Sequence, residues 1–369
     1  VKDALPRLEK LIEKALSRDE YSKSMARKLL PLVHQARLLA TEYDFVVANP
    51  PYMGSKFYPS LLKNFINQHY KDAKSDLYGA FINSNVLMAK KDGLVGMITI
   101  PNWMFLSSFE SVRSRILDYN AIISLIHIGR GVWGSDFGSC SFTLLRSELP
   151  DYKGVFKRLF DKQGSIASNE ELCLRFFISY LYTASGANFK KIPGSPIAYW
   201  FSDQLYDIFL GKSIGQYILT EGQNKTANND VFLRMHWEIN KKLNSIKWIP
   251  YAKGGPFRKW YGNIEHLIDW SEKSREFYRK NSSCRIVDKK FWYKEGITWT
   301  DITSGKTAFR YLPNGCTFDM SGPSAFFSRY IELIYYLGLL NTTIVQYIMP
   351  IINPTFHAQL RDIKIIPEP

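Results

Sequence analysis

The sequence predicts an α/β protein in which a partial, doubly wound sheet is followed by an α+β domain. Two observations lead to this expectation. Up to about residue 150, short apolar runs alternate with helical patterns, an order typical of a sheet with helices on its faces. From Gly222 to Arg310 the alternation is lost, and Trp, Tyr, Lys and Arg residues are interleaved. The chain of 369 residues is long enough for two or three domains.

The first elements follow from the spacing of apolar residues. Leucine and isoleucine recur at helical spacing within residues 3–40, and again within 60–70. Between these helices, Asp44-Phe45-Val46-Val47-Ala48 has no polar break after its first residue, which predicts a parallel strand that is apolar and buried on both faces. Asp76 is a plausible N-cap for a helix that we expect to reach about Lys90.

The elements after this helix alternate in the same way. We expect a turn at 91–93, a strand over 93–100, a helix over 109–119, strands over 121–128 and 142–146, and a further helix around 169–183.

The predicted strand at 44–48 ends in Asn49-Pro50-Pro51-Tyr52, and this turn is the strongest functional signal in the chain. The two prolines fix their φ angles and donate no N–H, so the turn presents carbonyl oxygens. Asn49 adds an amide oxygen, and Tyr52 adds a flat aromatic face. Two acceptors beside a stacking surface suit an exocyclic amino group on a planar ring. Ligands bind at the carboxyl ends of strands in open α/β sheets, so the position also suits a reaction site.

Asn-Pro-Pro-Tyr after a strand resembles the catalytic motif of the amino-methyltransferases, chiefly the N6-adenine DNA methyltransferases. The resemblance implies that Asn49 Oδ1 and the Pro50 carbonyl accept the two amino hydrogens of adenine, while Pro51 completes the rigid turn. It also implies S-adenosyl-L-methionine as the cofactor, no metal, and stacking of Tyr52 on an adenine flipped out of the duplex. A related motif serves enzymes that methylate glutamine or RNA.

The downstream sequence extends this resemblance. The stretch from Ser55 to Leu106 is most similar to the methyltransferases of the phage-defence BREX systems, called PglX, on the strength of Met53-Gly54-Ser55-Lys56, Ser75-Asp76-Leu77 and Trp103 to Ser108. Type IIG restriction–modification enzymes come next. The resemblance implies a partial Rossmann-like methyltransferase sheet followed by an α+β target-recognition domain, with a closing strand within 351–367, in an enzyme of phage defence or restriction–modification.

Two further site residues come from the same resemblance. Gly129-Arg130-Gly131-Val132-Trp133 is similar to a Gly-x-x-aromatic segment that supplies a second ring to the flipped base, although it has one residue more. Trp133 is therefore the candidate for this stacking role, with Phe137 in reserve, and simple packing of Trp133 in a loop is the alternative. Asp76 is a candidate for lining the cofactor pocket, and its role as a helix cap is the alternative.

The positive charge is concentrated in one segment. The chain has a net charge of +14, and residues 223–310 hold 18 Lys and Arg against 9 Asp and Glu. Basic groups neutralise phosphates and aromatic groups contact bases, which predicts a polyanionic partner. The resemblance implies that this partner is double-stranded DNA. An aromatic-rich core with a solvated basic face is the alternative. The candidate DNA-binding residues are Lys253, Arg258, Lys259, Lys289 and Lys290.

These observations give four expected segments: a helical lead-in at 1–43, the catalytic half of the methyltransferase domain at 44–150, a connector at 151–222 and a DNA target-recognition domain at 223–369. No Gly-x-Gly turn for a cofactor precedes Asn49, and residues 1–43 contain no glycine. We therefore expect an internal or truncated piece, inactive alone, whose partner is the missing upstream segment or another phage-defence protein. No nuclease constellation is evident, and the six histidines suggest no site.

The remaining composition narrows the class of protein. The four cysteines form no CxxC pair, so neither a disulfide framework nor a zinc site is expected. No signal peptide or membrane-spanning run is evident, and a cytoplasmic protein is expected. Two other functions stay open: a non-catalytic DNA-binding module that lacks a cofactor site, and an RNA or protein (glutamine) methyltransferase.

Overall fold

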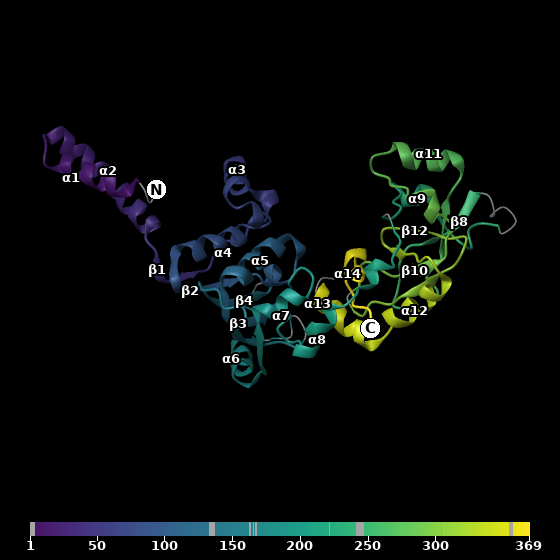
Figure 1. Cartoon of the computed structure of the whole chain (residues 1–369). Coiled ribbons are helices and arrows are strands. Elements are labelled where there is room, and N and C mark those ends of the chain that lie inside the picture. The colour runs from purple at the N-terminus through teal and green to yellow at the C-terminus, as the bar shows by residue number, and fades with distance from the viewer. Residues whose placement is uncertain are drawn as a thin grey trace. The chain divides into compact units, whose positions relative to one another are not determined.

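The structure is a computed structural model that describes residues 4–132, 137–161, 164, 166, 168–220, 222–240, 247–303, 305–353 and 357–369. The chain forms two compact units, Val1–Phe201 and Ser202–Pro369 (Figure 1). The first contains the predicted catalytic turn and the second contains the predicted DNA-binding residues.

The first unit begins with two helices, as the spacing of leucines predicts, and they pack against each other as a hairpin. Helix α1 (Leu5–Leu16) packs against α2 (Glu20–Ala40), and Leu5, Ile12, Ala26 and Val33 are buried between them. Asp19 caps α2 by accepting a hydrogen bond from the Ser22 N–H at 2.9 Å.

A six-stranded sheet forms the core of this unit. Its strands are β1 (Tyr43–Ala48), β2 (Ala89–Thr99), β3 (Ala121–Gly129), β4 (Ser139–Leu145), β5 (Lys153–Arg158) and β6 (Leu181–Ser185), in the order β1-β2-β4-β3-β5-β6. β1 is parallel to β2, whereas β4 is antiparallel to both β2 and β3. It follows that β1, β2 and β3 run in the same direction, so that their carboxyl ends lie at the same end of the sheet. The predicted α/β class is confirmed.

Helices line this sheet and position its loops. Helix α3 (Ser60–His69) precedes α4 (Leu77–Met88), which packs on β1 and β2. Helix α5 (Glu110–Tyr119) packs on β3 and on the short α7 (Gly186–Lys191).

Strand β1 corrects one prediction. Its side chains were expected to be buried on both faces, but Phe45 is 69% exposed and Val47 is 84% exposed. The strand lies at the edge of the sheet, and within the described residues β2 is its one sheet neighbour. An apolar run shows that a strand has apolar surface, but it does not show which other element covers that surface.

The start of β2 also differs from the prediction. A turn was expected at Lys91 to Gly93, but the strand already begins at Ala89 and runs through these residues. Asp92 has a φ of +62° in the middle of this stretch, and the register with β1 shifts there. The predicted turn residues therefore form an irregularity within the strand instead of ending it.

The sheet continues into the segment that we expected as a connector. Helix α6 (Asn169–Ile178) ends before the predicted residue 183, and β6 follows it and pairs with β5. This pairing buries Phe156 and Ala184. The contacts of residues 151–201 therefore belong to the first unit, and the division of the chain by function stays a prediction.

The second unit is α+β, as predicted. One sheet has the order β12-β8-β9-β7 and a second has β11-β10-β13. The strands are β7 (Leu233–Met235), β8 (Trp248–Ala252), β9 (His266–Asp269), β10 (Gly296–Thr298), β11 (Arg310–Leu312), β12 (Thr317–Phe318) and β13 (Ser324–Ala325). Its helices among the described residues are α8 (Asp203–Asp207), α9 (Asn229–Phe232), α11 (Glu272–Lys280), α12 (Tyr330–Leu340), α13 (Thr343–Ile352) and α14 (Leu360–Lys364).

The end of the chain is helical where a closing strand was expected within 351–367. Helix α13 extends to Ile352, because Val345, Ile348 and Met349 bury one face at helical spacing. Asp362 starts α14 by accepting a hydrogen bond from the Gln359 N–H at 2.9 Å. No helix among the described residues is long and apolar enough to cross a membrane.

Candidate active site

The turn Asn49 to Tyr52 follows β1 at the end of the sheet where the carboxyl ends of β2 and β3 also lie. Pro50 is buried, whereas Asn49 and Tyr52 are exposed. The structure therefore places the amide and the aromatic ring of the motif where a base from outside the protein can reach them.

Tyr52 is held against Asn49. Its hydroxyl lies 3.2 Å from Asn49 Oδ1 and 3.3 Å from the Ile98 carbonyl oxygen, and it can donate to either. Its ring meets the ring of Tyr78 edge-on, with 6.0 Å between the centroids. Partial desolvation raises the pKa of the Tyr52 phenol above its usual value, so Tyr52 is a neutral donor at physiological pH.

Asp76 fastens the segment after Tyr52 to helix α4. Its Oδ1 accepts hydrogen bonds from the N–H of Met53 at 3.1 Å and of Tyr78 at 3.5 Å, and the Leu77 N–H donates to the Met53 carbonyl at 3.0 Å. Burial raises the pKa of the Asp76 carboxyl, and these N–H groups oppose that shift. The capping role is thus observed, and the role at a cofactor pocket stays a prediction.

Arg113 on α5 orders the loop after β2, and it was not among the site residues predicted from the sequence. The side chain is 1% exposed, and it donates to the carbonyls of Trp103 (2.9 Å), Leu106 (2.7 Å) and Gly194 (2.6 and 2.9 Å). Burial lowers the pKa of the Arg113 guanidinium to about 10, which leaves it charged at pH 7. An arginine in an amphipathic helix gives no sequence signal that it is buried.

The base-stacking candidates after β3 are only partly described. Trp133 lies outside the described residues, and Phe137 is 68% exposed. His127, near the end of β3, is buried, and its Nδ1 lies 3.3 Å from the Tyr199 hydroxyl. Burial, followed by the charge of Arg158, lowers the pKa of His127 to about 3, so the imidazole is neutral. A neutral, enclosed imidazole packs the sheet and does not exchange protons at neutral pH.

Three of the predicted DNA-binding residues lie in the loop between β8 and β9. Arg258 is exposed, whereas Lys259 is part-buried and donates to the Asn341 carbonyl at 2.7 Å. Lys253 is part-buried. The same loop exposes three aromatic side chains, Phe257, Trp260 and Tyr261. The loop therefore combines basic and aromatic surface, with Arg258 more available to an outside ligand than Lys259.

The other two, Lys289 and Lys290, are exposed in a 3₁₀ turn over Lys289–Phe291. Phe291 and Ala252, the neighbours of Lys290 and Lys253, belong to one hydrophobic cluster. Phe257 and Arg310 also line a groove of about 500 Å³ together with Lys306, which the sequence analysis did not single out.

Comparison with known proteins gives a consistent picture. Residues 2–133 match the family described as Eco57I restriction-modification methylase. The chain is 34% identical to the adenine-specific methyltransferase BrxX of Escherichia coli O9:H4 (strain HS), over 98% of this chain and 30% of that protein. It is 31% identical to the adenine-specific methyltransferase PglX of Lacticaseibacillus casei (strain Zhang), over 92% of this chain and 30% of that protein. The solved structure of the type IIL restriction-modification enzyme MmeI in complex with DNA aligns with a TM-score of 0.55 at 11% identity, over 85% of this chain and 45% of that one.

The chain therefore spans about 30% of the length of the curated relatives it matches. The predicted resemblance to adenine-specific methyltransferases of the PglX type is confirmed, and it covers most of the chain. The likeness to MmeI is at low identity and supports the fold alone.

Proposed function

We propose that this chain carries the adenine-binding half of an enzyme that transfers a methyl group from S-adenosyl-L-methionine to N6 of adenine in double-stranded DNA. The observation that carries the proposal is the Asn49-Pro50-Pro51-Tyr52 turn at the carboxyl edge of the sheet, with Tyr52 Oη 3.2 Å from Asn49 Oδ1. The names of the curated relatives support adenine as the target.

Asn49 and Pro50 orient the amino group. The adenine amino nitrogen is a weak nucleophile because its lone pair is delocalised into the ring. By accepting its two hydrogens, Asn49 Oδ1 and the Pro50 carbonyl pull the nitrogen toward tetrahedral geometry, which withdraws its lone pair from the ring π system. They also stabilise the positive charge that develops on the nitrogen. As the nitrogen gains the methyl group, it releases one hydrogen as a proton to solvent.

Tyr52 makes room for the base by changing its hydrogen bond. In the structure its hydroxyl lies against the Asn49 oxygen that the amino group needs. The Ile98 carbonyl, 3.3 Å from the same hydroxyl, gives Tyr52 an alternative acceptor when the base is bound. The ring then stacks on the extruded adenine while the hydroxyl stays satisfied.

We assign contacts with the adenine base to the described residues, but not most of the contacts with the cofactor. Asp76 was the candidate for the cofactor pocket, but its Oδ1 is engaged with the backbone of Met53 and Tyr78. When bound, S-adenosyl-L-methionine supplies the methyl group. We infer that most of its contacts come from strands beyond β1, because β1 exposes Phe45 and Val47 at the edge of the sheet. An upstream segment, as part of a longer protein or as a separate chain, would pair there.

The second unit has the surface expected of a DNA-recognition domain. Arg258, Lys289 and Lys290 are exposed, and the aromatic side chains beside Arg258 can stack on bases. We assign this unit to target recognition and the whole enzyme to phage defence or restriction–modification, in keeping with the relatives.

Substitution of Asn49 tests the proposal in a protein that also contains the upstream segment. Asn49→Ala should lower methylation of duplex DNA by ~10²–10³-fold, because the oriented acceptor is lost, while DNA affinity stays near that of the wild type. Asn67→Ala, which removes an exposed amide on α3, is the matched control. Wild-type turnover by Asn49→Ala would refute the assignment.

The products separate the proposed function from the two alternatives. Mass spectrometry of digested DNA should show N6-methyladenine. Methylated RNA or methylglutamine as the main product would favour another methyltransferase class. DNA binding without any methyl transfer in the presence of the upstream segment would favour a binding module.

A further inference from the structure

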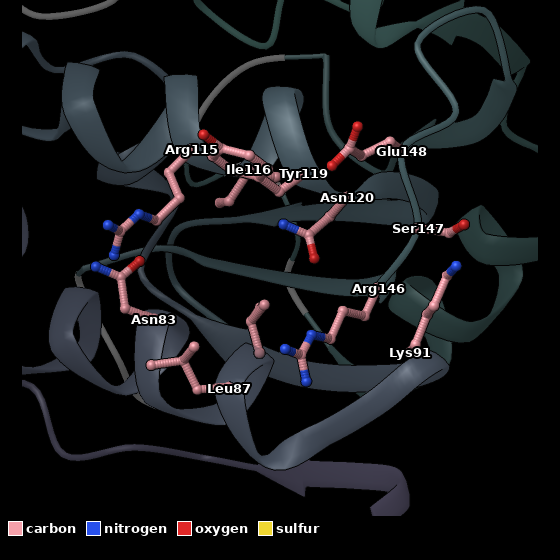
Figure 2. Close-up of a pocket in the computed structure, with 11 residues that line it drawn as sticks. Asn83, Leu87, Lys91, Arg115, Ile116, Tyr119, Asn120, Arg146, Ser147 and Glu148 are labelled. Carbon is pink, nitrogen blue, oxygen red and sulfur yellow. The ribbon is translucent and has the colours of Figure 1, made fainter. Parts of the chain in front are cut away.

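A cavity lies at the other end of the sheet from Asn49. It has a volume of about 860 Å³ and is formed by α4, the start of β2, the end of α5 and the segment after β4 (Figure 2). Lys91 stands near the start of β2, Asn120 directly before β3, and Arg146 directly after β4. Since β1, β2 and β3 run in the same direction, this cavity is at their amino ends and the candidate active site is at their carboxyl ends.

Asn120 is the unusual residue of this cavity. Its side chain is 5% exposed, and its Oδ1 has no hydrogen-bond partner among the residues that the structure describes. Buried polar atoms in folded proteins are almost always hydrogen-bonded. In Figure 2 the amide of Asn120 extends into the cavity, between the side chains of Arg115 and Arg146. The oxygen itself is closed to solvent in this arrangement, so the Asn120 side chain turns about its Cβ–Cγ bond to accept an N–H from a ligand in the cavity.

The charges around Asn120 favour an anion. Lys91, Arg115 and Arg146 line the cavity, against one carboxylate, Glu148. One guanidinium nitrogen of Arg146, Nη1, donates to the Ala89 carbonyl, which fixes this side chain at the wall. Arginine presents its remaining N–H groups in a planar fork that matches phosphate oxygens.

The walls between these groups are apolar. Val86, Leu87, Ile116 and Tyr119 line them, and the volume is within the range of small-molecule sites. We propose that this cavity binds a nucleoside phosphate whose base carries an exocyclic amino group, such as an adenine nucleotide. The apolar walls hold the base and the cations bind the phosphates. The Asn120 amide accepts from the amino group and donates to the neighbouring ring nitrogen, a pairing that asparagine makes with adenine.

This inference does not rest on the proposed methyl transfer. The groups that carry it belong to the first unit, none is in the Asn49 turn, and it concerns binding alone. The two proposals can therefore fail separately.

Titration calorimetry of the 369-residue chain with adenosine triphosphate is the direct test. We expect one site of micromolar Kd. Arg115→Ala and Arg146→Ala should each weaken binding about tenfold, as loss of a phosphate contact does. Lys63→Ala removes one exposed positive charge on α3, outside the cavity, and should leave binding unchanged.

Inosine triphosphate tests how the base is read. It has a carbonyl where adenine has the amino group, so we expect it to bind about tenfold more weakly than adenosine triphosphate. Asn120→Leu should abolish this preference while phosphate-dependent binding remains. Because this substitution removes an unsatisfied buried group, the variant should also unfold at no lower temperature than the wild type.

Four results would overturn the proposal. The first is that the folded chain binds no nucleotide at 1 mM, a concentration of about the weakest useful Kd. The second is equal binding of the two nucleotides, and the third is an equal loss of binding in the Lys63→Ala control. The fourth is displacement of the nucleotide by duplex DNA. The last result would place the nucleotide in the active site or on the DNA-binding surface instead.

Discussion

Replacement of Arg113 should destabilise the first unit more than that of any exposed arginine nearby. The guanidinium donates to the carbonyls of Trp103, Leu106 and Gly194, and so joins the loop after β2 to the segment after α7. Arg113→Met keeps the aliphatic length and the helix propensity but removes all of these donors.

The expected magnitude follows from the groups left behind. Three carbonyls lose a charged donor in a buried setting, and each hydrogen bond to a charged group contributes ~1.5–3 kcal/mol net. Burial of the methionine side chain offsets part of this loss, since it returns ~1.5–3 kcal/mol. We therefore expect the free energy of unfolding to fall by about 3–6 kcal/mol, and Tm to fall by about 6–24 °C at ~2–4 °C per kcal/mol.

Urea denaturation followed by circular dichroism measures this change. Arg115→Met is the matched control, because Arg115 lies on the same helix and is exposed, and it should change the free energy of unfolding by less than ~0.5 kcal/mol. Arg113→Lys should fall between the two, since one ammonium cannot reach all three carbonyls. A loss below ~1 kcal/mol in Arg113→Met would show that the loop is ordered by other contacts.

Three other predictions concern pH, DNA and the cofactor. The folded pKa of His127, about 3, is below its unfolded value of 6.5, so stability should be complete above pH 6.5 and decline by at most ~1.4 kcal/mol per unit as pH falls toward 3. In urea melts at several pH values, the His127→Phe variant should not show the part of this decline that His127 causes. An unchanged dependence of stability on pH in His127→Phe would contradict the prediction. Arg258→Ala should flatten the salt dependence of DNA binding by up to ~0.9 log–log unit in anisotropy titrations, and Lys259→Ala by less, because Lys259 already binds Asn341; a larger effect at Lys259 would reverse that assignment. In calorimetry, the chain alone should bind S-adenosyl-L-methionine poorly and gain affinity when the upstream segment is supplied, and micromolar binding without that segment would refute the incomplete-site interpretation.

The sequence by itself determined the local features of this protein. Apolar spacing located helices α1 and α2, the alternation of strands and helices gave the α/β class, and Asp76 marked the start of α4. The Asn49-Pro50-Pro51-Tyr52 turn pointed to the adenine-specific methyltransferases, which the relatives bear out. These features depend on residues close together in the chain, whose backbone preferences and side-chain chemistry can be read directly.

The tertiary structure decided everything that depends on partners distant in sequence. Phe45 and Val47 are exposed because of where β1 lies in the sheet, and 181–185 form a strand because β5 lies beside them. Arg113 is buried because the loop after β2 and the segment after α7 close over it. The cavity at Asn120 exists because α4, α5 and the sheet meet there. The physical reason is the same in each case. Burial and hydrogen bonding depend on two surfaces that meet, and a local stretch of sequence does not show which distant stretch packs on it.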